Sequence, residues 1–220
     1  MNDAHLLDRL RKLDCASLAD VDKSVAVMDA GLRPLKAGLK MVGVARTVRC
    51  FEDFLPVIEA LGAAAANEVL VVDTAASTRA VVGELFSLEA ERRGLSGIIV
   101  DGPVRDIATI RTLSMPVYAR SFCPVSGTTR QPGEQQIQVQ CGGVSVHPGD
   151  IVFGDDDGIL VFDADALRTR LDRAEEIQSA ELEIRRRMAS GTSLFSMLNA
   201  EEHIEARKSD QDSALAFRLE

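Results

Sequence analysis

A short run of β-branched residues, followed by a turn and charged side chains, constrains the fold most strongly. Ile98-Ile99-Val100 is typical of a strand buried on both faces of a sheet. The next residues, Asp101-Gly102-Pro103, predict a turn, and Pro103 predicts a helix that extends to Leu113, because proline fits the first helical turn. Asp101, Arg105 and Asp106 would then lie at the carboxyl end of a strand, where open α/β sheets bind ligands.

Arg105 is unusual in this predicted position. A cation in the first turn of a helix opposes the positive end of the helix dipole. Local misfits of this kind often mark functional sites. Two interpretations remain open: a functional cation, which the pattern favours slightly, or a surface arginine paired with Asp101 or Asp106.

The same order of strand and helix occurs upstream. Residues 41–50 predict a strand and residues 54–66 a helix. Residues 69–72 predict another buried strand, and residues 83–93 a helix that Gly94 ends. The packed face of this second helix would be formed by Leu85, Phe86, Leu88 and Ala90. Successive strand–helix units predict neighbouring parallel strands joined by right-handed crossovers.

Beyond these units the pattern changes to short strands and turns. Alternating residues in 136–140 and 144–146 predict a hairpin with one apolar face. A second hairpin would join residues 151–153 to residues 159–162 through the acidic turn 154–158. That turn lacks the further ligand spacing of a calcium-binding EF-hand, so a tight acidic hairpin is the preferred interpretation.

Residues 163–189 predict the longest helix of the chain. Its stripe, spaced by threes and fours, consists of Leu167, Leu171, Ala174, Ile177, Glu181, Ile184 and Met188. Glu181 is a carboxylate where the stripe requires an apolar residue. The pattern supports two interpretations evenly: a glutamate at the edge of the stripe, or a helix that lies on another surface and directs Glu181 into a site there. Residues 200–220 would form a loosely docked helix or be disordered.

Composition argues against several classes of partner. The net charge is −9, Trp is absent and Tyr occurs once, which disfavours binding to nucleic acid. No apolar run reaches the roughly 18 residues of a membrane span, and the N-terminus resembles no signal peptide, so we expect a cytoplasmic protein. The scattered cysteines predict reduced packing residues. Because the three histidines are isolated, carboxylates and water would hold any metal, which favours Mg²⁺ or Mn²⁺.

Several blocks of the sequence resemble one known family. The blocks are Val69–Asp73, Gly83-Glu84-Leu85, Gly97–Asp106 and Pro148–Gly158. Over about residues 15–190 the chain resembles the family that joins 4-hydroxy-4-methyl-2-oxoglutarate/4-carboxy-4-hydroxy-2-oxoadipate aldolases with the regulator of ribonuclease activity A. The most specific feature is Asp-Gly-x-x-Arg-Asp after a buried strand, with Gly-Glu-Leu upstream.

The resemblance implies a fold and an assembly. Residues 1–162 would form an α/β core of the swivelling-domain type, with three layers in the order α-β-β-α. Residues 163–220 would form a helical extension that packs on a neighbouring subunit. The family assembles as trimers or hexamers, with active sites between subunits. Its aldolases are class II lyases, in which a divalent metal, here Mg²⁺ or Mn²⁺, replaces the Schiff-base lysine.

The resemblance also implies roles for single residues. Arg105 and Asp106 would be catalytic: Arg105 would bind the keto oxygen of a pyruvoyl group and stabilise the enolate, and Asp106 would be the direct ligand of the metal. Glu84 would contact the metal through water. Glu181, from a neighbouring subunit, would do the same. The misfit of Arg105 with the helix dipole is then offset by the bound anionic substrate.

A helix start would bind the substrate carboxylate. The backbone N–H groups expected to do so belong to Gly83, Glu84, Leu85 and Phe86. Elementary physics agrees with this implied role, because free N–H groups and the helix dipole favour an anion at a helix N-terminus. The implied reaction is retro-aldol cleavage of a 4-hydroxy-2-oxo dicarboxylic acid, such as 4-hydroxy-4-methyl-2-oxoglutarate, to pyruvate and a second oxo-acid. Oxaloacetate decarboxylation passes through the same enolate.

Two features leave the substrate and the branch of the family open. The loop 74–82 is less rich in glycine than is usual for the family, and Val82 replaces a frequent aromatic residue. The alternative function is a protein-binding regulator of a ribonuclease without catalysis. That branch lacks the long C-terminal helix, so residues 167–188 favour the enzyme.

Overall fold

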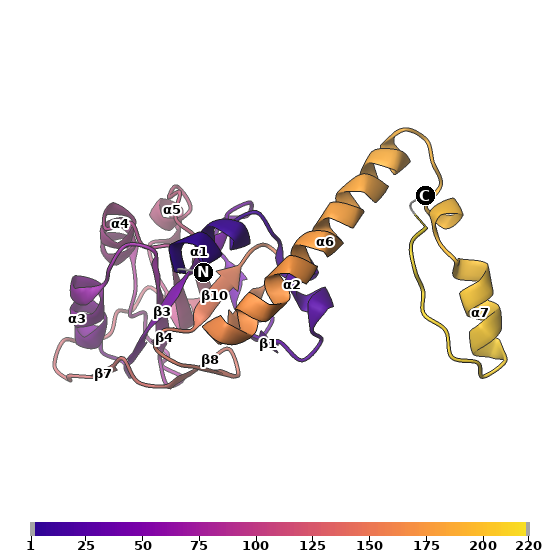
Figure 1. Cartoon of the computed structure of the whole chain (residues 1–220). Coiled ribbons are helices and arrows are strands. Elements are labelled where there is room, and N and C mark those ends of the chain that lie inside the picture. The colour runs from indigo at the N-terminus through magenta and orange to yellow at the C-terminus, as the bar shows by residue number, and fades with distance from the viewer. Residues whose placement is uncertain (1–2, 219–220) are drawn as a thin grey trace. The chain divides into compact units, whose positions relative to one another are not determined.

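The structure is a computed structural model that describes residues 3–218. The chain folds into two compact units, Met1–Leu171 and Asp172–Glu220 (Figure 1). The first unit begins with the helices α1 (Asp3–Leu10) and α2 (Cys15–Val21). Asp14 caps α2 by accepting a hydrogen bond from the Ser17 N–H at 2.8 Å. No helix among the described residues is long and apolar enough to cross a bilayer.

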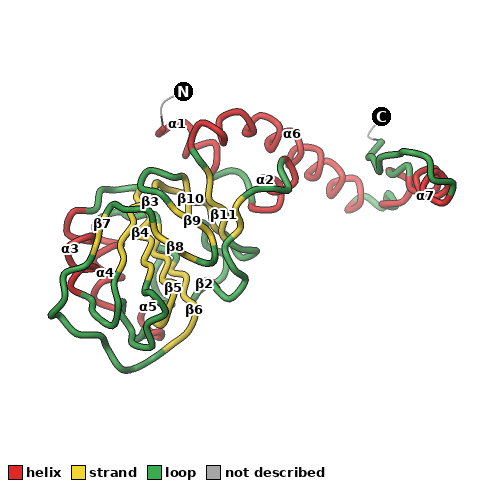
Figure 2. The backbone as a smooth tube through the Cα atoms, turned by 90° about the horizontal axis from the view of Figure 1, so that it is seen from below, coloured by secondary structure: helices red, strands yellow, loops and turns green. Residues whose placement is uncertain are grey.

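The first unit is built on a mixed nine-stranded sheet. Its strands follow the order β1 (Ala26–Val27), β11 (Ile159–Phe162), β10 (Ile151–Gly154), β3 (Met41–Arg49), β4 (Glu68–Asp73), β5 (Gly97–Val104), β6 (Val117–Phe122) and β2 (Arg33–Pro34), and β7 (Glu134–Gln135) pairs with β3. The strands β3, β4, β5 and β6 are parallel to one another and run side by side (Figure 2). The predicted parallel units are therefore confirmed.

Each face of the central strands is covered by a different layer. Side chains of α3 (Leu55–Ala63) and α4 (Glu84–Arg92) pack with Leu70, Val72, Ile98 and Val100 on one face. On the other face, Val69, Val71 and Ile99 pack with the hairpin formed by β8 (Val139–Cys141) and β9 (Val144–Val146). Successive residues of β4 and β5 thus point to opposite layers. The predicted α/β class, the hairpin of residues 151–162 and the strand at 98–100, buried on both faces, are confirmed. The other predicted hairpin is present with a shorter first strand, Val139–Cys141 in place of residues 136–140.

The cysteines are free, and three of the four are buried. Burial raises the pKa of the Cys50 thiol to about 12. Burial also raises the pKa values of the Cys15 and Cys141 thiols. These three thiols therefore behave as small packing residues, as the sequence predicts.

Two predictions about local structure are wrong. The helix predicted from Pro103 does not form there, because β5 continues to Val104 and the following helix, α5 (Ile107–Ile110), has four residues. Pairing with β6 is irregular between Val100 and Pro103, and such a bulge tolerates a proline that cannot donate to the sheet. This path of the chain requires glycine at position 102, because an added Cβ would clash with Thr74 Oγ1 at a distance of 2.4 Å.

The predicted packed face of α4 is also wrong in part. Leu85 is 70% exposed and Leu88 is 43% exposed, whereas Ser87 and Ala90 are buried. These small residues bring the helix close to the sheet. The buried Ser87 hydroxyl is satisfied because it donates to the Gly83 carbonyl at 2.9 Å.

The long helix α6 (Ala164–Ala189) contributes its first residues to the first unit and the rest to the second. The second unit continues with the 3₁₀ helix η1 (Leu194–Met197) and α7 (Ala200–Lys208). Asn199 joins the final segment to the start of α7, because its side chain donates to Ala214 and accepts from the Ala216 N–H. The tail thus contains a helix, as one of the two alternatives predicted from the sequence requires, and none of the residues of α7 is buried.

Candidate active site

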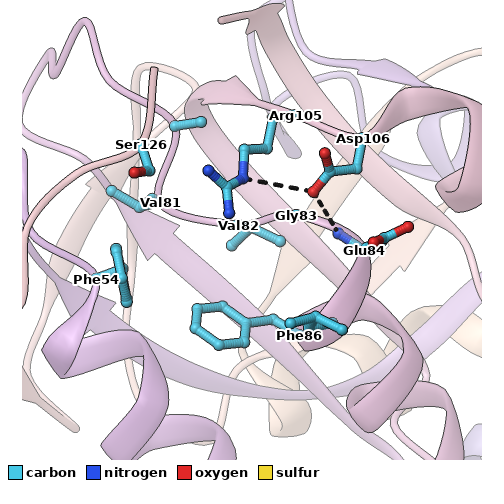
Figure 3. A pocket seen from close by; sticks show the side chains of 11 residues that line it. Phe54, Val81, Val82, Gly83, Glu84, Phe86, Arg105, Asp106 and Ser126 are labelled. Atoms are coloured by element: carbon cyan, nitrogen blue, oxygen red, sulfur yellow. Dashed lines mark hydrogen bonds and ion pairs between the residues drawn. The ribbon is translucent and has the colours of Figure 1, made fainter. Parts of the chain in front are cut away.

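A pocket of about 150 Å³ lies where the segment after β5 meets the start of α4. Its polar end is formed by Glu84, Arg105 and Asp106 (Figure 3). The parallel pairing of Val82 with Val104, together with a hydrogen bond from the Arg105 N–H to the Val82 carbonyl at 3.1 Å, holds the two segments together. Two stretches about 20 residues apart in the sequence therefore form one site.

Gly83 allows the two segments to touch. An added Cβ would lie 2.5 Å from Asp106 Oδ2, 3.0 Å from Arg105 Cγ and 3.2 Å from Arg105 Nε. The backbone φ of Gly83 is −146°, which any residue adopts, so the close approach is what requires glycine here. Asp106 Oδ2 accepts a hydrogen bond from the Glu84 N–H at 3.2 Å.

Asp106 has a left-handed backbone conformation, with φ of 59° and ψ of 40°. Aspartate is one of the few residues that tolerate this conformation, which is rare and concentrated at functional sites. Its carbonyl caps α5 by accepting hydrogen bonds from Thr109 and Ile110. The backbone thus fixes the direction of the carboxylate, which is 37% exposed toward the pocket.

Arg105 lies beside this carboxylate. Its Nε is 3.4 Å from Asp106 Oδ2, and its side chain is 42% exposed. Of the two ion pairs considered from the sequence, the one with Asp106 is present. The one with Asp101 is absent, because Asp101 instead accepts from Arg120 Nε at 2.5 Å and from the Gly142 N–H at 2.7 Å. Asp101 is therefore not part of this pocket.

The start of α4 supplies N–H groups to the pocket. The Glu84 N–H binds Asp106, and the Leu85 and Phe86 N–H groups lie in the first turn, where a helix offers them no partner of its own. The Glu84 side chain accepts from Thr109 Oγ1 at 2.7 Å, which fixes it beside the site. The predicted residues Gly83, Glu84, Leu85 and Phe86 all line the pocket together with Arg105 and Asp106.

The other end of the pocket is apolar. Phe54 and Phe86 meet edge to face, with ring centroids 5.7 Å apart. Figure 3 shows Phe54 and Val81 on the side of the Arg105 guanidinium away from Asp106 and Glu84, with Ser126 close to Val81. Sequence reasoning missed Phe54, Val81 and Ser126 as site residues. They come from separate loops, and no motif marks them.

Asp53 anchors the loop that carries Ser126. It is 1% exposed, and its carboxylate accepts four hydrogen bonds, from the Thr128 hydroxyl and the N–H groups of Leu55, Arg130 and Gln131. Burial by itself would raise the pKa of Asp53. The hydrogen bonds outweigh that effect and lower the pKa to about 2.

We expect Asp53 to make unfolding pH-dependent. Because its pKa is lower in the folded state than the roughly 3.9 of an unfolded aspartate, its contribution is present above about pH 4 and is lost as the pH falls toward 2. Asp53→Asn should lose on the order of 1–3 kcal/mol at pH 5, since an amide group would face N–H donors, and should show a weaker pH dependence from pH 4 to pH 2.

Urea unfolding followed by circular dichroism at several pH values measures both effects. Asp165→Asn is the matched control, because the side chain of Asp165 is 90% exposed and it pairs only at the surface with Arg168. Parallel pH curves for Asp53→Asn and the unaltered protein would contradict the prediction.

The polar end of the pocket fits a hard divalent cation. Asp106 Oδ1 takes part in no hydrogen bond between described residues, and Glu84 contributes a second carboxylate to the lining of the pocket. Mg²⁺ is commonly held by one or two carboxylates and several waters. Within residues 3–218 no group of three or more His, Cys, Asp or Glu side chains could hold a metal, so further ligands would come from water or another subunit.

Glu181 is placed on the part of α6 that belongs to the second unit. Its side chain is exposed, whereas Leu167, Leu171, Ala174 and Ile184 of the same stripe are buried. Ile177 is half-buried and Met188 is exposed. The role of Glu181 in the site of a neighbouring subunit stays a prediction.

Comparisons with known proteins show the family of the chain. Residues 4–161 match the RraA-like family, described as Aldolase/RraA. An uncharacterized protein from Methanocaldococcus jannaschii is 36% identical over 78% of this chain and 84% of its own length. A protein from Halalkalibacterium halodurans named "Putative 4-hydroxy-4-methyl-2-oxoglutarate aldolase" is 30% identical over 84% of this chain and 88% of its own length.

A solved structure has the same fold over most of the chain. It is RraAS2 from Streptomyces coelicolor, described as an unusual member of the RNase ES inhibitor RraA protein family. The two share 27% sequence identity with a TM-score of 0.73, over 84% of this chain and 97% of that chain. The chain therefore belongs to the RraA-like family, which includes members named as aldolases and members named as ribonuclease inhibitors.

Proposed function

We propose that the protein is a divalent-metal-dependent lyase that cleaves a 4-hydroxy-2-oxo acid to pyruvate and a second carbonyl compound. One observation carries the proposal. The Asp106 carboxylate, the Arg105 guanidinium and the first turn of α4 converge on one pocket, and Gly83 allows their contact. The aldolase name of the Halalkalibacterium relative supports the same class of reaction.

The pocket offers separate partners for the two ends of a pyruvoyl group. The N–H groups of Leu85 and Phe86 at the start of α4 would bind the carboxylate, because a helix N-terminus favours an anion. The Arg105 guanidinium would donate to the 2-oxo oxygen. This donor gains strength as negative charge develops on that oxygen, which is how enolate formation is favoured over the ground state.

Asp106 would hold the divalent cation directly. Glu84, fixed by Thr109, and Glu181 of a neighbouring copy would contact it through water. When bound, the cation would supply Lewis acidity toward the 2-oxo group. This arrangement would place the site between subunits of a trimer or hexamer, which we include in the proposal.

The reaction balances without an external oxidant or reductant. A base takes the proton of the C4 hydroxyl, the C3–C4 bond breaks, and the C4 oxygen becomes the carbonyl of the second product. The bonding electrons remain on the pyruvoyl half as an enolate that Arg105 stabilises. Protonation of C3 then gives pyruvate. Decarboxylation of oxaloacetate would leave the same enolate, so it is an expected side activity.

We expect pyruvate to be released from 4-hydroxy-4-methyl-2-oxoglutarate and from oxaloacetate in the presence of Mg²⁺ or Mn²⁺. EDTA should lower the rate at least about 100-fold, because Lewis acidity contributes several kcal/mol to such reactions. The same protein should exchange the methyl protons of pyruvate for deuterium in D₂O, which tests enolate formation alone. Proton NMR measures both reactions.

The alternative function is inhibition of a ribonuclease by direct binding, which the description of the Streptomyces relative suggests. The exposed Leu85 and Leu88 on α4 are a specific feature that favours it, because exposed apolar side chains beside a pocket suit a protein partner. Folded protein that neither releases pyruvate nor exchanges its methyl protons would contradict the lyase and favour this alternative.

A further inference from the structure

We propose that the substrate carries a hydrocarbon group at C4 rather than a second carboxylate. This inference rests on the proposed function and narrows its substrate class. It departs from the dicarboxylic acid that the family resemblance implies. The pocket would thus accept the aldol adduct of pyruvate with an apolar ketone or aldehyde.

The first observation that supports this inference is the set of charged residues that line the pocket. Among the described residues that line it, Arg105 is the one cation, and Glu84 and Asp106 are carboxylates. The proposed pyruvoyl group already occupies Arg105 and the start of α4. A second carboxylate of the substrate would find no further cationic side chain among the described residues of this chain that line the pocket.

The second observation is the apolar character of the residues at the other end of the pocket. Beyond the Arg105 guanidinium the space is bounded by Phe54, Phe86, Val81 and Val82, and Ser126 is the neutral polar residue there (Figure 3). Phe54 and Phe86 hold each other edge to face, which gives this wall a defined shape. An apolar group placed here would be removed from water, and each buried methyl group contributes to binding.

The arginine nearest this wall in the sequence does not alter the charge of the pocket. Arg79 precedes the wall residues Ala80 and Val81 but does not line the pocket. Its Nε lies 3.5 Å from Glu52 Oε2 instead. Among the described lining residues of this end, a carboxylate would find the neutral Ser126 hydroxyl but no cation, and burying it there is far more costly than burying a hydrocarbon of equal size.

Two nearly isosteric substrates test the inference. One is 4-hydroxy-4-methyl-2-oxoglutarate. The other is 4-hydroxy-4,5-dimethyl-2-oxohexanoate, in which an isopropyl group replaces the second carboxylate. Cleavage of the first yields pyruvate twice, and cleavage of the second yields pyruvate and 3-methylbutan-2-one. Proton NMR of both products gives kcat/KM for each substrate, and we expect the isopropyl compound to be favoured at least about 100-fold.

A cation placed at the wall should shift this ratio. Ser126→Lys adds one at a half-buried position and should move the ratio at least about tenfold toward the dicarboxylate. Phe54→Ala removes part of the apolar wall and should lower the preference for the isopropyl compound about tenfold without adding charge. Leu88→Lys is the matched control, because Leu88 is exposed on α4 outside the pocket, and it should leave the ratio unchanged.

The outcomes separate the two proposals. Metal-dependent methyl exchange of pyruvate together with a preference for the isopropyl compound supports both. Methyl exchange together with equal or better cleavage of the dicarboxylate overturns the inference and leaves the lyase in place. Absence of both exchange and cleavage in folded protein overturns the proposed function, and the inference falls with it.

Discussion

Asp106→Asn is expected to lower kcat/KM for pyruvate release at least about 1,000-fold while the fold is retained. Asparagine tolerates the left-handed backbone of this position and can still accept from the Glu84 N–H, so the substitution removes little except the charge. That charge would hold the divalent cation, and loss of electrostatic groups at such sites costs several kcal/mol of transition-state stabilisation.

Asparagine is preferable to alanine for this test. Asp106→Ala would add a backbone cost of about 1–2 kcal/mol in the left-handed conformation and would mix stability with chemistry. Mn²⁺ binding measured by titration calorimetry, thermal unfolding and pyruvate release together separate the two effects. Asp165→Asn again serves as the charge-matched control. If Asp106→Asn binds Mn²⁺ as tightly as the unaltered protein, Asp106 is not the metal ligand.

Much of the central sheet could be predicted because its strands are continuous apolar runs. Residues 69–72 and 98–100 pack on both faces of the sheet, so they show the pattern of buried parallel strands without ambiguity. The polar end of the site was predicted through the family resemblance, which named Gly83 to Phe86 together with Arg105 and Asp106, and all of these residues line one pocket. Neighbouring parallel strands bring these short segments together.

The errors have identifiable physical causes. Pro103 indicated a helix start, but an irregularity in the pairing with β6 accommodates it within β5. The predicted face of α4 failed because Ser87, and not Leu85, packs inward, with its hydroxyl satisfied by the Gly83 carbonyl. In both cases the structure depends on local hydrogen bonding, which the spacing of apolar residues in the sequence does not indicate.

The apolar end of the pocket was beyond prediction for a different reason. Phe54 precedes α3, and Ser126 lies in the loop that Asp53 anchors, more than 70 residues further along the chain. No regular element connects them, and a long-range hydrogen-bonded loop brings them together. The part of the site that would set substrate choice is therefore the part that only tertiary structure reveals.

Gly83→Ala is expected to lower kcat/KM for pyruvate release at least about 100-fold through geometry alone. The added methyl group would meet Asp106 Oδ2 at 2.5 Å and Arg105 Cγ at 3.0 Å. The ends of flexible side chains can move away, so the fold should survive with a loss of about 1–3 kcal/mol. The displaced carboxylate and guanidinium would then no longer be aligned with the reacting atoms of the substrate. A shift of about 1 Å can lower the rate by two orders of magnitude.

Gly62→Ala is the matched control, because Gly62 lies in α3 with no atom within 4 Å of an added Cβ and should become slightly more stable. A double-mutant cycle then identifies the cause. If Gly83→Ala acts by displacing Asp106, adding it to Asp106→Asn should lower kcat/KM for pyruvate release less than about threefold further. If the two losses in kcat/KM are fully additive, the added methyl group does not act by displacing Asp106, and the proposed cause of the Gly83→Ala effect is wrong.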